Sequence, residues 1–478
     1  MEPKPVFVGG RWITTKNVQV VKSPYDGREA GSCCLAGDQE MELALEAAAR
    51  ASNETPRLPT HLRSAICSDA AKAIASRSDD FADLITAETG KPIKLSRGEV
   101  GRAVITFQLA AEAAHDALGE VLPADAEART EGYLALAVRV PRGPVAAISP
   151  FNFPLNLVAH KVAPALAAGC PIVLKPPPQA PLTSLLLAEV LEDCGIPGGF
   201  LSVLPCEVAV AERMVTDDRI RTLSFTGSAK VGWNLRNAAD RKHVLLELGG
   251  NAAAIVHGDA DLPWAVSRLA MGAFAHAGQV CISVQRIFVQ DDIYDRFKDA
   301  FLEEAARVPT GDPWDPDTLV GPVIDSASAD RVTAWVNEAE EAGSSVHSFG
   351  ERQGNLLPLY VIDNASPSIR VSCEEVFGPV VALYRYSDFR EALNEVNRGV
   401  YGLQAGIFTS DIGLAFEAVW RLDVGGVIVN DFPTFRVDST PYGGTKDSGM
   451  GREGVRYAVE EMSEYRTVIF RGGLPTPQ

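Results

Sequence analysis

Val145-Ala146-Ala147-Ile148-Ser149 opens the part of the chain, residues 145–248, that decides the fold. Short apolar runs alternate there with stretches that have the apolar spacing of helices. We expect strands at 145–149, 172–175, 201–204, 222–225 and 244–248, and helices at 155–168, 181–194, 208–215 and 231–239. Strands separated by single helices form a parallel sheet with helices on both faces. The chain is therefore predicted to be an α/β protein with a doubly wound parallel sheet.

Polar residues stand at the carboxyl ends of three of these strands, which is the edge at which such sheets bind ligands. Asn152 follows the first strand, and Lys175 ends the second. Thr226-Gly227-Ser228 ends the fourth and opens a helix, whose free N–H groups suit a phosphate. The dinucleotide fingerprint Gly-x-Gly-x-x-Gly is absent. Taken singly, Lys175 also fits a solvated strand end, and Asn152 fits a turn between two prolines.

Cys281 and Glu247 supply the strongest chemical signal. Cys281 lies in a connector, residues 278–283, between an expected helix at 261–277 and an expected strand at 284–289. Glu247 stands at the end of the strand at 244–248, just before two glycines. A thiol and a carboxylate are the nucleophile and base that oxidation of an aldehyde through a thioester requires. Alone, each residue is also typical of ordinary structure, as a buried thiol or a strand-end carboxylate.

The composition limits the class of protein and its partners. A chain of 478 residues, 46% hydrophobic and 22% charged, has room for two or three globular domains. The net charge of −18 argues against nucleic acid and anionic membranes. Eight cysteines without Cys-x-x-Cys and seven histidines without His-x-x-x-His predict reduced thiols and no metal site. No signal peptide or uninterrupted apolar span is present, so we expect a cytoplasmic protein.

Eight stretches, taken in their order along the chain, resemble motifs of the aldehyde dehydrogenase superfamily. Each is moderately specific, and the resemblance extends over essentially the whole chain. The stretches are PFNFP at 150–154, APALAAG at 163–169, LKP at 174–176, FTGS at 225–228, ELGGN at 247–251, GQVC at 278–281, EVFGP at 375–379 and PYGGTKDSG at 441–449.

The resemblance implies the domain organisation. It places a doubly wound cofactor-binding domain at 1–118 and 142–249, and an α/β catalytic domain at 250–449. Expected helices at 40–51, 61–75 and 97–117 belong to the first domain. The ranges 119–141 and 450–478 would form a β arm, with strands at 133–140 and 465–470, that crosses to a neighbouring subunit. Such an arm implies a homodimer or homotetramer, and an internal hairpin is the alternative.

The resemblance also implies catalytic roles. Cys281 would attack the aldehyde carbon, and Asn152 with the Cys281 N–H would hold the oxyanion. Glu247 would activate the thiol and the water that hydrolyses the thioester. Members that make acyl-CoA tend to lack a glutamate at this position, so we favour a free carboxylate as product. A CoA-acylating enzyme and a non-catalytic binding protein of the same fold are the alternatives.

NAD or NADP is the cofactor that the resemblance implies. Lys175 and Glu375 would hold the two riboses, Ser228 would sit at the pyrophosphate, and Phe377 would lie near the nicotinamide or be a plain core residue. Members that prefer NAD often carry a glutamate where this chain has Pro178, so we expect NADP to be tolerated, with NAD use left open. The residues expected to bind the cofactor are Ser149, Phe151, Lys175, Gly227, Ser228, Glu375 and Phe377.

The substrate is expected to be a short aldehyde that is anionic or hydroxylated. Arg102 and Arg436 resemble arginines that grip an anionic group, for which the guanidinium fork is suited. Their alternatives are ion pairs, of Arg102 with Glu99 and of Arg436 with Asp438. Val280 stands where the phosphate-handling branch often has arginine, which weakens the case for a phosphate. Succinate semialdehyde, lactaldehyde and 3-sulfolactaldehyde fit about equally well, and a general short-chain aldehyde dehydrogenase remains an alternative.

Overall fold

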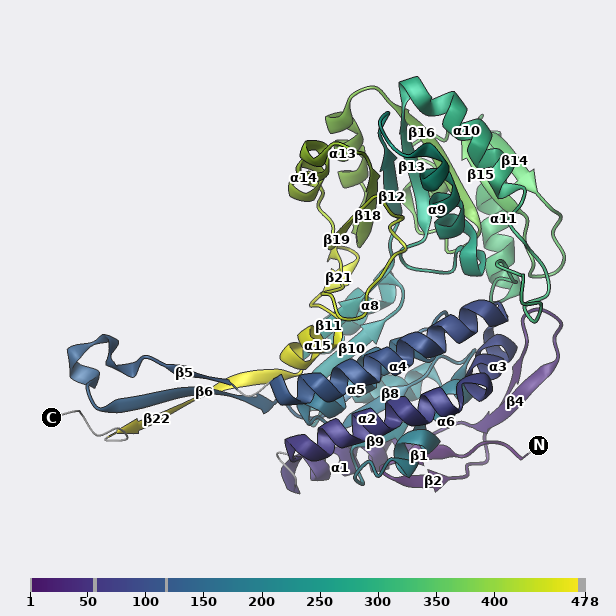
Figure 1. The fold of residues 1–478 in the computed structure, drawn as a ribbon. Helices are drawn as coiled ribbons and strands as arrows, with labels where there is room; N and C mark the ends of the chain where they lie inside the picture. Colours follow the sequence, from purple (N-terminus) through teal and green to yellow (C-terminus); the bar gives the residue numbers. More distant parts are fainter. Residues whose placement is uncertain (1, 55–57, 117–118, 472–478) are drawn as a thin grey trace.

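The computed structural model describes residues 2–54, 58–116 and 119–471, which form two parts built on sheets and a projecting arm (Figure 1). The first sheet has eight strands in the order β2-β1-β9-β8-β7-β10-β11-β21. The five central strands are parallel, whereas β1, β2 and β21 pair antiparallel with their neighbours. The strands are β1 (Val6–Val8), β2 (Arg11–Ile13), β7 (Val145–Ile148), β8 (Ile172–Lys175), β9 (Leu201–Val203), β10 (Thr222–Thr226), β11 (His243–Glu247) and β21 (Gly449–Met450).

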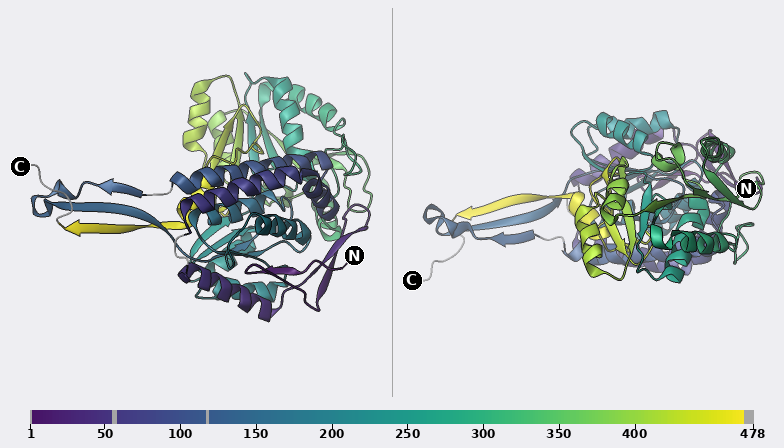
Figure 2. Two further views of the ribbon diagram at one scale, coloured as in Figure 1. Left: turned by 60° about the horizontal axis from the view of Figure 1, so that its bottom comes forward. Right: turned by 90° about the horizontal axis from the view of Figure 1, so that it is seen from above.

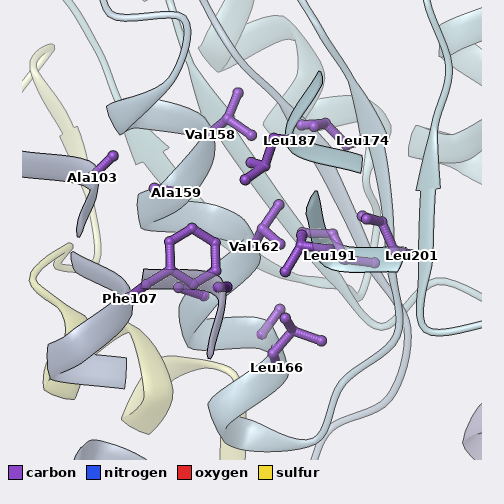
Figure 3. Packing of buried hydrophobic residues seen from close by; sticks show 14 of the residues in the cluster. Ala103, Phe107, Val158, Ala159, Val162, Leu166, Leu174, Leu187, Leu191 and Leu201 are labelled. Carbon is purple, nitrogen blue, oxygen red and sulfur yellow. The ribbon is translucent and has the colours of Figure 1, made fainter. Parts of the chain in front are cut away.

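Helices cover both faces of this sheet, because successive apolar residues of its strands point to opposite sides. Val145 and Ala147 of β7 belong to a core shared with α2, α4, α5 and α6, part of which is drawn in Figure 3. Ala146 belongs to a second core, shared with α1 and α7. The helices are α1 (Asp38–Glu54), α2 (Thr60–Ser76), α3 (Ser78–Thr89), α4 (Ile93–Asp116), α5 (Asn156–Ala168), α6 (Pro181–Asp193), α7 (Val208–Thr216) and α8 (Ala229–Ala238).

The doubly wound parallel sheet predicted from the sequence is confirmed. Every strand and helix expected between residues 145 and 248 is present, with ends that shift by at most two residues. Helix α4 begins at Ile93, earlier than the expected 97, and residue 117 lies outside the described residues. Helix α3 was not predicted; a single residue, Arg77, separates it from α2.

A second sheet carries the segment that contains Cys281. Its seven strands have the order β14-β15-β16-β13-β12-β18-β19, and all are parallel except β14. Helices α9, α10 and α11 pack on one face, and α13 and α14 on the other. The elements are β12 (Ala252–Val256), α9 (Leu262–Phe274), η3 (Ala275–Gly278), β13 (Val284–Gln290), α10 (Asp291–Ala305), α11 (Ser326–Glu341), β14 (Ser345–Phe349), β15 (Leu359–Asp363), α12 (Arg370–Cys373), β16 (Val380–Tyr386), α13 (Phe389–Asn397), β18 (Gln404–Phe408), α14 (Ile412–Arg421) and β19 (Gly426–Val429).

The arm is a three-stranded antiparallel sheet of β22, β6 and β5 that extends away from the body in all three views (Figures 1 and 2). It pairs the two runs expected to be strands, with Ser463 opposite Pro141 and Arg471 opposite Tyr133. Its strands are β5 (Gly119–Leu122), β6 (Tyr133–Pro141) and β22 (Ser463–Arg471), with 3-10 turns η1 (Ala124–Ala126) and η2 (Ala128–Thr130). The remaining elements are β3 (Val18–Lys22), β4 (Glu29–Cys34), β17 (Tyr401–Gly402), β20 (Thr445–Lys446) and α15 (Val455–Glu461).

Among the described residues, no helix has both the length and the apolar character that crossing a membrane demands.

Candidate active site

Glu247 and Cys281 come together from different sheets. Glu247 is the last residue of β11 in the first sheet, and Cys281 lies between η3 and β13 in the second. The Cys281 Sγ is 3.5 Å from the Glu247 Oε1, although 34 residues separate them in the chain. Glu247 also pairs with Gly449 of β21, which ties the strand end to the segment that follows Tyr442. The thiol and the carboxyl group therefore meet where the two sheets approach each other.

The backbone before Cys281 has an unusual conformation. His276, Ala277 and Gly278 follow one another with φ of 54°, 55° and 67°. Non-glycine residues seldom adopt this left-handed region, and such strain is concentrated at functional sites. A Cβ at Gly278 would lie 2.1 Å from the carbonyl oxygen of Gly378, so only glycine fits there. The turn sends the chain sharply from α9 into the connector that holds Cys281.

Burial and neighbouring charges set the proton equilibria of this pair. Glu247 is 3% exposed, and its Oε2 has no hydrogen-bond partner among the residues that the structure describes. Burial, reinforced by the negative charge of Glu453, raises the pKa of Glu247 to about 8. Burial and the charge of Glu247 also raise the pKa of the Cys281 thiol well above its usual value. Near neutral pH, both groups mostly hold their protons.

Asn152 lies against the connector, as an oxyanion-binding residue requires. Its Nδ2 donates to the carbonyl of Gln279 at 2.9 Å, two residues before Cys281. The amide is almost fully buried, and its Oδ1 has no partner in the described part of the chain. An amide nitrogen carries two hydrogens, so one donor of Asn152 remains for a ligand oxygen.

A layer of buried charges surrounds Glu247. The Lys161 Nζ lies 2.7 Å from the Thr226 Oγ1 and 3.4 Å from the Glu453 Oε1. The Arg436 Nη2 lies 3.2 Å from the Glu453 Oε2. Lys161, Arg436 and His160 lower the pKa of Glu453 against the effect of burial, so Glu453 stays ionised. This negative charge is the neighbour that helps keep Glu247 protonated.

Arg102 and Arg436 converge on one carboxylate, Asp438. Arg102 binds it through both oxygens, at 3.0 and 2.7 Å, and the Arg436 Nε lies 3.6 Å away. His160 contacts the same carboxylate at 2.9 Å. The alternative that pairs Arg102 with Glu99 is wrong, because Glu99 binds Lys91 and the backbone N–H groups at the start of α5. The alternative that pairs Arg436 with Asp438 is present, alongside the closer Glu453.

The residues expected to bind a cofactor lie at the strand ends of the first sheet. Lys175 ends β8, is 8% exposed, and has one hydrogen bond within the described chain, to the carbonyl of Pro176 at 3.3 Å. Gly227 donates its N–H to the carbonyl of Glu247 at 3.1 Å. Ser228 precedes α8, and its side chain leaves the described N–H groups of that helix uncapped. Ser149 is buried after β7, with its Oγ 3.5 Å from the carbonyl of Pro150.

Glu375 and Phe377 lie in the connector between α12 and β16 of the second sheet, and Phe377 contacts Phe151, which follows β7. The Glu375 carboxylate accepts the N–H of Gly250 at 3.0 Å, and burial raises its pKa to about 7. Phe377 has a φ of 48° and packs edge-on against Phe151, with ring centroids 5.9 Å apart. A left-handed aromatic residue is costly for core packing alone, which weighs against the reading of Phe377 as a plain core residue.

Comparison with known proteins identifies the family. The family model described as "Aldehyde dehydrogenase family" matches residues 12–468. The chain belongs to the aldehyde dehydrogenase family. It is 42% identical to a 3-sulfolactaldehyde dehydrogenase of Priestia aryabhattai over 97% of each chain. It also resembles the structure of aldehyde dehydrogenase 21 from Physcomitrella patens with the product succinate, at 40% identity, 99% coverage of both chains and a TM-score of 0.96.

A third relative is the NADP-dependent glyceraldehyde-3-phosphate dehydrogenase of Bacillus halodurans, whose structure contains NADP. It is 33% identical, covers 98% of this chain and 100% of its own, and has a TM-score of 0.95. Like these relatives, this aldehyde dehydrogenase is an NAD(P)-dependent oxidoreductase. The superfamily and the short-aldehyde branch that the motifs predicted are thereby confirmed.

The strand-end residues of this aldehyde dehydrogenase fit a dinucleotide. The buried ammonium of Lys175 has no carboxylate partner in the described chain, so it can donate to ribose hydroxyls or phosphate. The uncapped N-terminus of α8 offers N–H groups and a positive dipole to a pyrophosphate. Pro178 is exposed and places no negative charge near a 2′-phosphate.

Sequence reasoning missed five residues of the site: Lys161, Glu453, His160, Asp438 and Tyr442. Tyr442 stands inside the motif PYGGTKDSG at 441–449, and Asp438 was expected only as a possible ion-pair partner of Arg436. Lys161 and His160 lie on α5, whose residues are all buried. A lysine and a histidine in an otherwise apolar helix were the signal that could have found them, because buried charges need partners.

Proposed function

We propose that the protein oxidises a short aldehyde with an anionic or hydroxylated tail to its carboxylate, with Cys281 as nucleophile and Glu247 as base. The observation that carries this proposal is the 3.5 Å contact between the Cys281 thiol and a buried Glu247 whose second oxygen is unpartnered among the described residues. A thiol with only a structural role does not need a buried carboxyl group as its neighbour. A thiol next to a carboxylate that can act as base is an arrangement that suits acyl transfer through a thioester.

The first half of the reaction follows from the proton equilibria. Glu247, when ionised, takes the proton of the Cys281 Sγ, and the thiolate attacks the aldehyde carbon. The carbonyl oxygen gains negative charge, which the free N–H of Asn152 Nδ2 and the N–H of Cys281 stabilise. Such donors typically lower a barrier by a few kcal/mol. NAD(P) bound at the strand ends supplies the hydride acceptor.

The second half releases the acid. Glu247 first releases the thiol proton to solvent and then takes a proton from a water molecule. The oxygen of that water attacks the thioester carbon, and the Cys281 sulfur leaves as thiolate. The raised pKa of Glu247 makes its carboxylate a stronger base than an exposed glutamate. The same shift means that only a fraction of the enzyme is ready to react at neutral pH.

Two substitutions test these roles. Cys281→Ala removes the nucleophile, so oxidation should fall by at least about a thousandfold while the protein still binds NAD(P). Glu247→Gln should produce about one equivalent of reduced cofactor per site and then a much slower steady state, because hydrolysis stalls. Stopped-flow absorbance of the reduced nicotinamide measures the loss of oxidation in Cys281→Ala and the burst in Glu247→Gln. Full turnover by Cys281→Ala, or an unchanged steady state in Glu247→Gln, contradicts the assignment.

The proposal that the substrate has an anionic tail is based on Arg102 and Arg436. Arg102, Arg436 and Lys161 outnumber Asp438 and Glu453 in the ion-pair network that these residues form, and Glu247 is mostly neutral near pH 7. The described side chains in this layer thus carry a net positive charge, which favours an anionic aldehyde. The names of the three relatives mention 3-sulfolactaldehyde, the product succinate and glyceraldehyde-3-phosphate. All three compounds are anionic, which supports an anionic aldehyde as substrate.

A substrate panel tests this preference. We would measure kcat/KM for 3-sulfolactaldehyde, succinate semialdehyde, lactaldehyde, glyceraldehyde-3-phosphate and propanal, each with NAD and with NADP. Arg102→Ala should lower kcat/KM for anionic aldehydes about ten- to a hundredfold and leave propanal within about twofold. Arg97→Ala is the matched control, because Arg97 lies on the same helix and pairs with Asp79 on the surface at 3.6 Å.

The outcomes of this panel separate the alternatives. Equal activity on propanal, unaffected by Arg102→Ala, indicates a general short-chain aldehyde dehydrogenase in which Arg102 is structural. Turnover that depends on added CoA indicates acyl transfer to CoA in place of hydrolysis. We further propose that NADP is accepted as readily as NAD, because Pro178 lacks the carboxylate that would repel a 2′-phosphate.

We also propose a division of the chain by role. The ranges 1–118 and 142–249 would bind the cofactor, and 250–449 would form the catalytic domain. Within 119–141 and 450–478, the strands β5, β6 and β22 would join subunits in a homodimer or homotetramer, whereas β21 and α15 belong to the first sheet and its core. Support comes from the separate cores of the two sheets and from the arm, which makes its sheet outside both of them.

A further inference from the structure

Tyr442 places a phenol group against the sulfur of Cys281. Its Oη lies 3.1 Å from the Cys281 Sγ, and the side chain is 3% exposed. The backbone of Tyr442 is fixed on both sides, since its N–H donates to Glu453 at 3.0 Å and its carbonyl accepts from Glu453 at 2.6 Å. A phenol held this firmly against a thiol is not explained by packing, because phenylalanine would fill the same volume without burying a hydroxyl.

The neighbours of the sulfur decide which atom donates. The Cys281 S–H can donate to the Glu247 Oε1 at 3.5 Å, so the sulfur lone pairs remain free to accept. The Tyr442 O–H then donates to the sulfur. The chain of donors therefore runs from the Tyr442 Oη to the Cys281 Sγ and from there to Glu247. Its direction lets the thiol proton move to Glu247 while the sulfur keeps a hydrogen bond.

Arg436 strengthens Tyr442 as a donor. Its guanidinium carbon lies 3.8 Å from the centroid of the Tyr442 ring, and Glu453 holds it there. Burial and the negative charges of Cys281 and Glu247 raise the pKa of Tyr442 well above its usual value, and the charge of Arg436 offsets this in part, so the phenol keeps its proton and can donate it in a hydrogen bond. The same cation offsets negative charge that forms on the sulfur. Tyr442 and Glu247 thus both contact the sulfur, and Arg436 lies over the Tyr442 ring.

We propose that Tyr442 is a further catalytic residue, whose O–H stabilises the Cys281 thiolate by a hydrogen bond. This inference rests on the proposed role of Cys281 as nucleophile. In the first half-reaction, the S–H bond breaks, its proton binds the Glu247 Oε1, and the Tyr442 O–H bond stays intact as its hydrogen bond to sulfur shortens. In the second half-reaction, the carbon–sulfur bond breaks, and Tyr442 receives the departing thiolate in the same way.

Alkylation of Cys281 by iodoacetamide tests this role without any turnover. We would follow the labelling of the Cys281 peptide by mass spectrometry from about pH 6 to about pH 10, in wild type and Tyr442→Phe. Because the pKa of the Cys281 thiol lies well above its usual value, only a small thiolate fraction reacts in this pH range. Losing one hydrogen bond to the charged sulfur should therefore slow labelling about tenfold at each pH. Exposed Cys373 serves as the internal standard in each sample, and its profile should not move.

The matched control is Tyr386→Phe. Tyr386 is also buried, and its hydroxyl donates to the backbone carbonyl of Val256 at 3.4 Å, away from Cys281. Its removal should leave the Cys281 labelling profile in place. A thermal unfolding scan of both variants confirms that each retains its fold.

Each outcome bears on one conclusion. An unchanged labelling rate of Cys281 in Tyr442→Phe, even with a lower kcat/KM, would show that the residue only shapes the site and would overturn the proposal. Turnover retained by Cys281→Ala would instead remove the proposed nucleophile. Because labelling reports the thiol and turnover reports the reaction, the two failures are distinguishable.

Discussion

At the scale of single residues, a pair of carboxyl groups controls when the thiol and the water can lose their protons. Glu453 is held ionised by Lys161 and Arg436, and its charge adds to burial in keeping the proton on Glu247. Like charges in a low dielectric cannot both form at low cost. One of these cations, Arg436, also lies over the ring of Tyr442, whose hydroxyl contacts the Cys281 sulfur. The site therefore links the proton affinity of Glu247 to the buried cations around Glu453.

The pH dependence of hydrolysis should report this link. Glu247 accepts protons only when ionised, so kcat should rise as the pH increases through about 8. Glu453→Gln removes the negative neighbour, which lowers the pKa of Glu247 and should move the rise down by about one pH unit. Steady-state kcat from about pH 6 to about pH 10 measures the shift, with burst kinetics to verify that hydrolysis limits the rate.

Glu460→Gln is the control for this shift. Glu460 lies on α15, close in sequence to Glu453, and pairs with Arg456 on the surface at 3.4 Å. Its removal should leave the profile in place. If Glu453→Gln also leaves the midpoint unchanged, another group sets the pH dependence of hydrolysis.

The sequence points to the proposed reacting residues more clearly than to the side chains that contact them. Cys281, Glu247 and Asn152 stand beside glycines and prolines at strand ends and connectors, where such residues are conspicuous. Their partners lie in elements whose pattern is already explained by packing, as Lys161 does within α5. Asp438 is separated from Arg102 by 336 residues, so only the folded chain shows that they pair. Long-range ion pairs leave no periodic signal in a sequence.

At the scale of elements, regular alternation made the first sheet predictable. Its parallel strands are buried on both faces, so each one appears in the sequence as a short apolar run. Helices between these strands end at glycine, as α5 does before Gly169. The antiparallel edge strands were not predicted, since β21 has only two residues. The turn at η3 could not be predicted either. His276 and Ala277 are not residue types that favour a positive φ, so the sequence does not predict their conformation, which tertiary contacts impose.

At the scale of the whole molecule, the contacts within a single chain do not explain why the arm projects from the body. Its three strands stand clear of both cores, with free edges at β5 and β22 (Figure 2). Val121, Tyr465, Ile469 and Phe470 are large hydrophobic residues exposed on these edge strands. Exposed edges with apolar side chains promote pairing between chains unless a partner covers them. The arm therefore fits contact with a second copy better than an isolated hairpin.

Ile469→Lys tests this assembly. Ile469 is 61% exposed on β22, so a lysine costs the isolated arm little, but it would put a charge into a contact between subunits. We expect wild type to have a mass of two or four times 51.1 kDa by light scattering after gel filtration, and the variant to be shifted toward a single chain. Arg466→Lys, a charge-preserving change at an exposed position of the same strand, should keep the wild-type mass. A wild-type protein that already runs as one chain, or an Ile469→Lys variant of unchanged mass, would mean that the apolar arm is not buried between subunits.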